Sequence, residues 1–171
     1  RFDIKLDGID YDAKFVFETV GYTLEGSEIG ASFGLVQLEN LTSNIKTRRD
    51  NFTKQTEFFK NYSDYFDTPI EKSNVYTGWL AFPVLIKKSA PFSRKEFQIY
   101  LEKNNIQTRV VFTGNVLRQP MMKNVNYVGN PDDFINADRV MKQGILLACH
   151  HGLTDEMINH LYESIDLFIS Q

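Results

Sequence analysis

The chain has 171 residues, of which 19 are basic and 22 acidic, so its formal net charge is −3. This length suits one domain, and 42% hydrophobic residues, including 13% aromatic, can fill a sizeable core, which excludes a disordered tail, a collagen-like fibre and a disulfide scaffold. A slightly acidic chain has no general attraction for phosphate backbones, so nucleic acid is not expected as the main ligand.

Compartment signals are few. Cys149 is the single cysteine, so no internal disulfide can form, as is typical of a reducing compartment. No run approaches the roughly 18 apolar residues of a membrane span, and the N-terminal segment lacks the apolar stretch of a signal peptide. We therefore expect a cytoplasmic protein without a membrane partner. The chain begins with Arg1 rather than Met, which leaves its natural length open.

The first third of the chain is predicted to be mainly helical. Alternating residues over 11–20 favour a short extended segment, and Ser27 is a candidate N-cap for the helix that follows. An apolar residue recurs at every seventh position: Leu38, Ile45, Phe52, Phe59 and Phe66. This stripe predicts one long helix, or two helices that meet at a bend, ending before Pro69.

Three segments are predicted as strands. β-branched and aromatic residues are frequent over 75–88, where Pro83 could introduce a kink, and again over 108–112. Residues 145–149 are the third strand, and 117–130 is predicted to be loop because proline and glycine interrupt it.

The remaining segments are predicted helices. Ser93 and Glu96 have the spacing of a capping box for a helix from Arg94 to about residue 104. Residues 133–144 form another helix, and Thr154 caps the last. Helices around about three strands give an α/β or α+β domain. So small a sheet would not cover the stripe of the first helix, which predicts a partner surface outside this chain.

Familiar catalytic signatures are absent. The sequence contains no glycine-rich phosphate loop, no Gly-x-Ser-x-Gly elbow and no His-Glu-x-x-His metal site. His150 and His151 are adjacent and would point to opposite sides of a strand end, and His160 falls on the last helix. We therefore expect structural histidines and no metal site.

One polar cluster stands out, formed by Arg109, Asn115, Arg118 and Gln119. Arginine forks suit carboxylates or phosphates, and amides suit sugar hydroxyls, so the cluster is a candidate binding site. The alternative is that Arg109 forms an internal ion pair and Asn115 makes a turn. Spacing alone leaves both open.

Three segments resemble a known family. GYTLEGSEIGASFGLVQLENL at 21–41 is similar to the DegT/DnrJ/EryC1/StrS family of sugar aminotransferases, where a Gly-Tyr-Asn turn precedes a helix. TRVVFTGNVLRQP at 108–120 resembles the branch containing the NDP-4-keto-6-deoxyhexose 3-dehydratases of lipopolysaccharide biosynthesis. GLTDEM at 152–157 resembles the start of the last helix in that branch. The resemblance extends over essentially the whole chain but reaches only the final part of the family's sequence.

The resemblance implies the C-terminal small domain of a fold type I enzyme that uses pyridoxal or pyridoxamine 5'-phosphate. Residues 1–26 would end the large coenzyme domain, and 27–171 would be the small domain. The catalytic Lys or His would precede this chain. Tyr22 and Thr23 would approach the coenzyme phosphate, although Thr23 replaces the family's Asn and has a shorter reach.

The same resemblance implies an activity. The coenzyme supplies an electron sink, so the C3 hydroxyl of an NDP-4-keto-6-deoxyhexose can leave. Arg109, Asn115, Arg118 and Gln119 would line the nucleotide-sugar entrance, in a homodimer that some members combine with a reductase. The 171 residues alone would be inactive and bind no coenzyme. The alternatives are the small domain of an NDP-sugar 4-aminotransferase and a stand-alone binding or dimerisation module.

Overall fold

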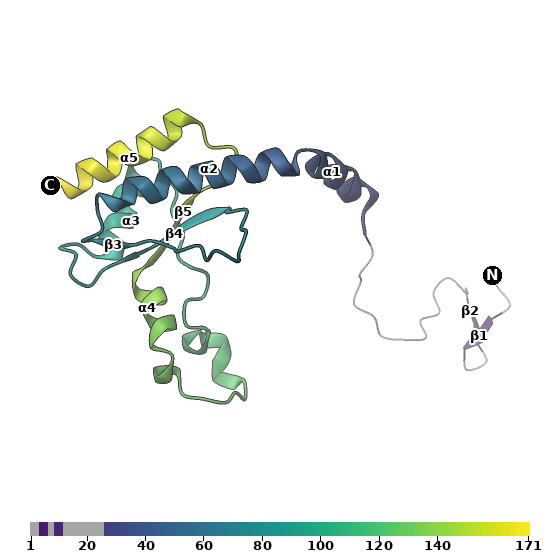
Figure 1. Ribbon diagram of the computed structural model, residues 1–171. Coiled ribbons are helices and arrows are strands. Elements are labelled where there is room, and N and C mark those ends of the chain that lie inside the picture. Colours follow the sequence, from purple (N-terminus) through teal and green to yellow (C-terminus); the bar gives the residue numbers. More distant parts are fainter. Residues whose placement is uncertain (1–3, 7–8, 12–25) are drawn as a thin grey trace. The chain divides into compact units, whose positions relative to one another are not determined.

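The computed structural model describes residues 4–6, 9–11 and 26–171 (Figure 1). The chain divides into two compact units, residues 1–39 and 40–171. In the first, β1 (Ile4–Leu6) pairs antiparallel with β2 (Ile9–Tyr11), and α1 spans Glu28–Glu39. The extended segment predicted at 11–20 lies outside the described residues, apart from Tyr11.

Helix α1 starts where the sequence predicts. The Gly30 N–H donates to Ser27 Oγ at 3.5 Å, so Ser27 is the N-cap. None of the helix's residues is buried within the described structure, and its larger apolar side chains are more than half exposed: Ile29, Phe33, Leu35, Val36 and Leu38.

Helix α2 (Leu41–Lys60) begins the second unit. The predicted long helix is therefore two helices, with Asn40 between them. Phe52 and Phe59 of the sevenfold stripe are buried. Phe66 is buried too, but it lies in a strand, because α2 ends six residues earlier. The prediction of one apolar helix face through Phe66 was wrong there, since strand and helix residues share the same core.

The second unit contains an antiparallel sheet in the order β3-β4-β5. These strands are Phe66–Asp67, Ala81–Ile86 and Gly144–Ala148. The small mixed α/β fold with about three strands is confirmed, but β3 was not among the three predicted strands. The middle strand is shorter than the predicted 75–88. Pro83 pairs with Leu146 of β5, whereas β3 pairs only with Leu85 and Ile86. No residue of β3 therefore lies opposite Pro83.

The strand predicted at 108–112 was wrong in extent. Only Arg109 forms a bridge to β5, where its N–H donates to the Leu146 carbonyl at 3.1 Å and its carbonyl accepts from the Leu146 N–H at 2.7 Å. Phe112 has φ of 45° and Gly114 has φ of 60°. These left-handed backbone conformations turn the chain away from the sheet and prevent the strand from continuing.

Local capping signals predicted the later helices well. Helix α3 (Arg94–Lys103) has the full capping box between Ser93 and Glu96. Thr154 Oγ1 accepts from the Met157 N–H at 3.3 Å at the start of α5 (Asp155–Ile169). Helix α4 is Ile135–Gln143, close to its predicted bounds.

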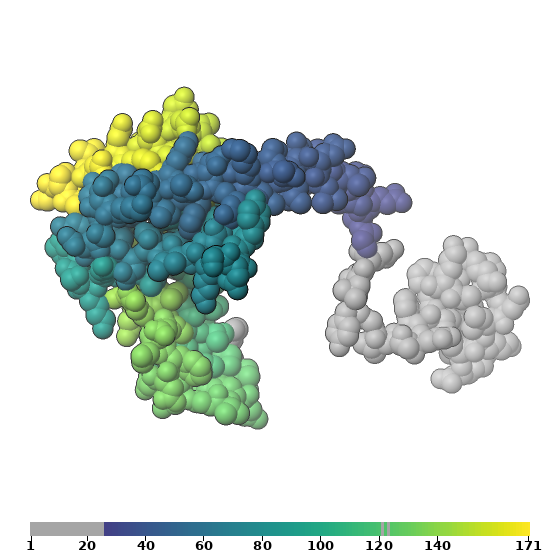
Figure 2. All heavy atoms as spheres, viewed as in Figure 1, coloured from purple at the N-terminus to yellow at the C-terminus, as the bar shows by residue number. Residues whose placement is uncertain are grey.

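The predicted loop at 117–130 contains short helical turns. Turn η2 spans Val116–Arg118, η3 spans Pro120–Asn124 and η4, just beyond the predicted loop, spans Pro131–Asp133. Two of these turns begin with proline, whose fixed φ suits a first helical position. Together with α4 they project from one end of the sheet, in green in Figures 1 and 2.

The core lies between the sheet and three helices. Phe82, Val84 and Ile86 alternate along β4 and are buried on one face. They form one cluster with buried residues of α2, α3 and α5, among them Phe59, Phe97, Leu101, Leu161 and Ile165. Helices α2 and α5 lie side by side, in contact through stacked rings of Phe58 and Tyr162, 4.0 Å apart (Figure 1).

Candidate functional site

The candidate site is the segment that begins at Arg109, which bridges to Leu146 of β5, and ends at Gln119. Asn115 is its buried centre, only 2% exposed. The Asn115 Nδ2 donates to the Pro131 carbonyl at 3.1 Å and to Asp138 Oδ1 at 2.8 Å, and its Oδ1 accepts from the Leu117 N–H at 3.2 Å. Asn115 therefore caps η2 and ties this turn to η4 and α4.

The Arg118 guanidinium forms ion pairs with two carboxylates. Its Nε donates to Asp138 Oδ1 at 2.5 Å and its Nη2 to Asp138 Oδ2 at 2.6 Å, and Nη2 also donates to Asp132 Oδ1 at 2.6 Å. The hydrogen bonds from Arg118 and Asn115 lower the pKa of Asp138 to about 2. Asp138 thus joins two of the predicted site residues. We call Asn115, Arg118, Asp132 and Asp138 the Asp138 network.

The backbone around this network has two unusual conformations. Gly114, with φ of 60°, lies against α4 so closely that a Cβ would be 2.4 Å from Met141 Cβ. Phe112 has a positive φ although it is not glycine, and its side chain is 89% exposed. The Gln119 Nε2 donates to the Thr113 carbonyl at 2.9 Å, which closes the segment on itself.

Arg109 is placed differently. The bridge to Leu146 fixes its backbone, while its exposed side chain forms no ion pair with another described residue. Its charge contributes to lowering the pKa of Glu102, although the larger cause is hydrogen bonding from Thr108. Of the two predicted alternatives, the turn at Asn115 is present, whereas Arg109 forms no ion pair with another described residue.

Sequence reasoning missed Asp132 and Asp138. They follow Arg118 by 14 and 20 residues and look like ordinary surface acids. No spacing rule links them to Arg118, because the turns between them determine the approach. Tyr22 and Thr23, the expected coenzyme contacts, lie outside the described residues.

Each of the three histidines has a hydrogen-bond partner within the described structure. His150 Nδ1 accepts from the Gly152 N–H at 3.1 Å, and His151 Nδ1 accepts from Arg48 Nε at 3.2 Å. The His160 Nε2 donates to the Asn104 carbonyl at 2.8 Å. Within the described residues no group of three or more histidine, cysteine or acidic side chains could hold a metal ion.

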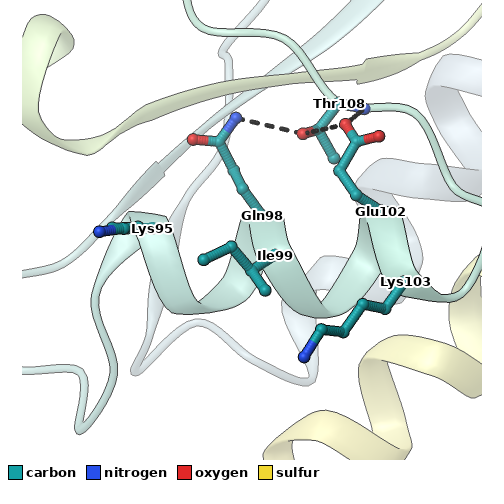
Figure 3. A pocket seen from close by; sticks show the side chains of 6 residues that line it. All are labelled: Lys95, Gln98, Ile99, Glu102, Lys103 and Thr108. Carbon is teal, nitrogen blue, oxygen red and sulfur yellow. Dashed lines mark hydrogen bonds between the residues drawn. The ribbon is translucent and has the colours of Figure 1, made fainter.

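One open cavity of about 500 Å³ lies on α3. Figure 3 shows Gln98 and Glu102 pointing toward Thr108, while Ile99 and Lys103 project from another side of the helix. Thr108 donates to Glu102 Oε1 through its N–H at 2.6 Å and its hydroxyl at 2.9 Å, and it accepts from Gln98 at 3.1 Å. Thr108, Gln98 and Glu102 therefore satisfy one another, and Lys95 and Lys103 are the cations at this cavity.

A second open cavity, of about 470 Å³, lies beside α2. There Glu71 holds Arg49 by two hydrogen bonds of 2.8 Å, and the Tyr76 ring centre lies 4.2 Å from the guanidinium. The charge of Arg49 is therefore already neutralised. Both cavities are open, and the polar groups named in each already bind one another, so no step of a coenzyme reaction is assigned to the described residues.

Comparison with known proteins decides the family. The model of the DegT/DnrJ/EryC1/StrS aminotransferase family matches residues 3–166. The chain belongs to this family. The resemblance expected from the segments at 21–41 and 108–120 is thereby confirmed.

Relatives of this DegT/DnrJ/EryC1/StrS chain include dehydratases. The lipopolysaccharide biosynthesis protein RfbH of Salmonella typhimurium is 29% identical over 92% of this chain and 36% of the relative. The dTDP-4-dehydro-2,6-dideoxy-D-glucose 3-dehydratase of Saccharopolyspora spinosa is 31% identical over 100% and 37%, respectively. Sugar transaminases match as well. Dehydratase and transaminase therefore both occur among the relatives.

A solved structure agrees with the fold. Escherichia coli GDP-4-keto-6-deoxy-D-mannose-3-dehydratase with bound hydrated PLP matches with a TM-score of 0.76 at 26% identity, over 88% of this chain and 38% of that one. This DegT/DnrJ/EryC1/StrS chain thus spans little more than a third of the length of such relatives. No helix in the described part of the chain is long and apolar enough to cross a membrane.

Proposed function

We propose that the chain is part of an enzyme dependent on pyridoxamine or pyridoxal 5'-phosphate that removes the C3 hydroxyl of an NDP-4-keto-6-deoxyhexose. The observation that carries this proposal is the similarity to 3-dehydratases along almost the entire chain, at 31% identity to the Saccharopolyspora enzyme. The product would be a deoxysugar precursor, and the reaction would take place in the cytoplasm.

The proposal gives the two ends of the chain different tasks. Residues 1–26 would end the coenzyme domain, with Tyr22 and Thr23 near the coenzyme phosphate, and 27–171 would be the small domain. In the small domain, the segment with Arg109, Asn115, Arg118 and Gln119 would line the nucleotide-sugar entrance. Arg109 supports this role because it offers an exposed cation that forms no ion pair with the residues that the structure describes.

The proposal also includes the surroundings of the site. The enzyme would act as a homodimer, and the exposed apolar side chains of α1, among them Phe33 and Leu38, would be covered by the rest of the enzyme or by the second subunit. A reductase would be a further partner where the reaction product needs reduction.

The second candidate is an NDP-sugar 4-aminotransferase, which the transaminases among the relatives favour. The difference is a single catalytic residue, which is Lys in transaminases and His in the 3-dehydratases. A histidine cannot form the covalent link to the coenzyme that a lysine forms, and this favours elimination.

The test is to express the full reading frame that contains this chain, add pyridoxamine phosphate and supply CDP-, GDP- and dTDP-4-keto-6-deoxyhexoses. Loss of the C3 hydroxyl, detected by mass spectrometry and NMR, supports the dehydratase. Formation of a 4-amino sugar with glutamate supports the transaminase instead. Residues 1–171 alone are expected to show no turnover and to retain no coenzyme absorbance after gel filtration; retained absorbance would contradict that part.

A further inference from the structure

The two carboxylates on Arg118 change what this arginine can bind. Arg118 carries one positive charge, and Asp132 and Asp138 carry two negative charges, with contacts of 2.5 to 2.6 Å. The group as a whole is therefore not positive. A diphosphate approaching Arg118 would therefore meet a guanidinium whose charge is offset by two carboxylates, and Lys142, whose charge also acts on Asp138, adds no more than one further positive charge.

The same contacts determine which N–H donors of the Arg118 guanidinium remain free of the described residues. A guanidinium has five N–H donors in a rigid plane. Nε and both protons of Nη2 are used by the three hydrogen bonds to Asp132 and Asp138. Nη1 forms no hydrogen bond with the described residues, and the Arg118 side chain is 35% exposed. One edge of the fork, with two donors, is therefore open.

Asp138 is held rigidly enough to orient that edge. Its side chain is only 14% exposed, and it also accepts from Asn115, which is itself buried. It lies on α4, next to the close approach of Gly114 to Met141. Asp138 therefore links the Arg118 guanidinium to helix α4, and this contact fixes its position more than the loop does.

We propose that Asp138 is a positioning residue that orients and neutralises Arg118, so that Arg118 Nη1 donates to an uncharged oxygen of the sugar and not to the diphosphate. This inference rests on the proposed function. The proposal gives the two arginines of the entrance different roles. Arg109 forms no ion pair with the described residues, although its charge acts on Glu102, and it would bind the anionic part of the ligand.

The experiment compares nucleotide with nucleotide sugar in the full-length protein loaded with its coenzyme. Affinities for CDP, GDP and dTDP and for their 4-keto-6-deoxyhexoses are measured by calorimetry, and KM and kcat by product analysis. Two variants are used, Asp138→Asn and Arg118→Lys. Asp133→Asn is the matched control, because Asp133 is an exposed neighbour whose side chain makes no ion pair with the described residues.

For Asp138→Asn and Arg118→Lys we expect about a tenfold loss of affinity for the nucleotide sugar and a similar rise in KM, as for one lost charge-assisted hydrogen bond. Affinity for the bare nucleotide should stay within about twofold, because the lost contact is to the sugar. The kcat should also stay within about twofold, because this contact would bind the substrate and the transition state equally. Asp138→Glu, which keeps the charge, should restore part of the loss. The control should match the wild type.

Each other outcome is decisive. A parallel loss of nucleotide affinity would mean that Arg118 binds the diphosphate, which overturns the inference, as would unchanged affinity for the nucleotide sugar. If Asp138→Asn does not fold, Arg118→Lys carries the same comparison. A wild type that binds these ligands without eliminating the C3 hydroxyl overturns only the proposed dehydratase, whereas a wild type that binds none of them overturns this inference.

Discussion

Gly114 and Met141 lie so close together that a side chain at residue 114 has no room. A Cβ at Gly114 would be 2.4 Å from Met141 Cβ and 2.8 Å from Met141 Cα. The φ of 60° at Gly114 also belongs to the left-handed region. This contact holds the segment after Arg109 against α4, and it explains why glycine is required before Asn115.

Gly114→Ala should therefore destabilise residues 40–171. We expect a loss of about 2–4 kcal/mol of unfolding free energy, from the left-handed backbone and from overpacking. Urea denaturation followed by circular dichroism measures it. Gly34→Ala, which meets no atom within 4 Å, is the control and should not lower stability. A Gly114→Ala protein as stable as the wild type would contradict the close contact.

Phe112 should behave in the opposite way. It has φ of 45° and an 89% exposed ring, so its backbone is strained and its side chain buries little apolar area. Phe112→Gly should raise the unfolding free energy by up to about 1 kcal/mol, because glycine removes a left-handed penalty of roughly 1–2 kcal/mol and costs roughly 0.5–1 kcal/mol in conformational entropy. Val128→Gly, at a 98% exposed residue without a positive φ, should instead lower stability slightly. A loss for Phe112→Gly would show that the ring is packed.

Asp138 should make stability depend on acid pH. Its pKa is lowered from 3.8 to about 2, so the folded state binds fewer protons than the unfolded state between these values. The stabilisation is complete above about pH 4 and is lost as the pH falls through about 2. The difference in melting temperature between wild type and Asp138→Asn should shrink over that range. A constant difference from pH 6 to pH 2 would contradict the ion pair with Arg118.

Cys149 should be unreactive in the folded protein. Its side chain is fully buried, its Sγ donates to the Arg48 carbonyl at 3.6 Å, and burial raises the pKa of the thiol to about 12. Labelling by a thiol reagent at pH 8 should be at least about 100-fold slower than in urea, because it requires opening of the structure. Labelling at the rate of a free thiol would show that β5 opens readily at this end.

Local chemistry was enough to predict much of the fold. Ser93 with Glu96, and Thr154, cap their helices through contacts within three residues, which the sequence shows directly. The strand predicted at 108–112 depended on more than residue type. Its apolar side chains suit a strand, but a strand exists only where a partner pairs with it, and the turn at Phe112 ends that pairing after Arg109.

The sequence by itself determined the caps, the approximate positions of β4 and β5 and the family resemblance, because each depends on neighbouring residues or on a recognisable segment. It also named Asn115 and Arg118 as candidates. Only the tertiary structure decided what they contact. Asp138 contacts Arg118, 20 residues earlier in the chain, and Asn115, 23 residues earlier. Its helix lies against this segment because of the turns that precede the helix and because Gly114 has no side chain. Sequence spacing carries no information about that approach, so the neutralisation of Arg118 appears only in the fold.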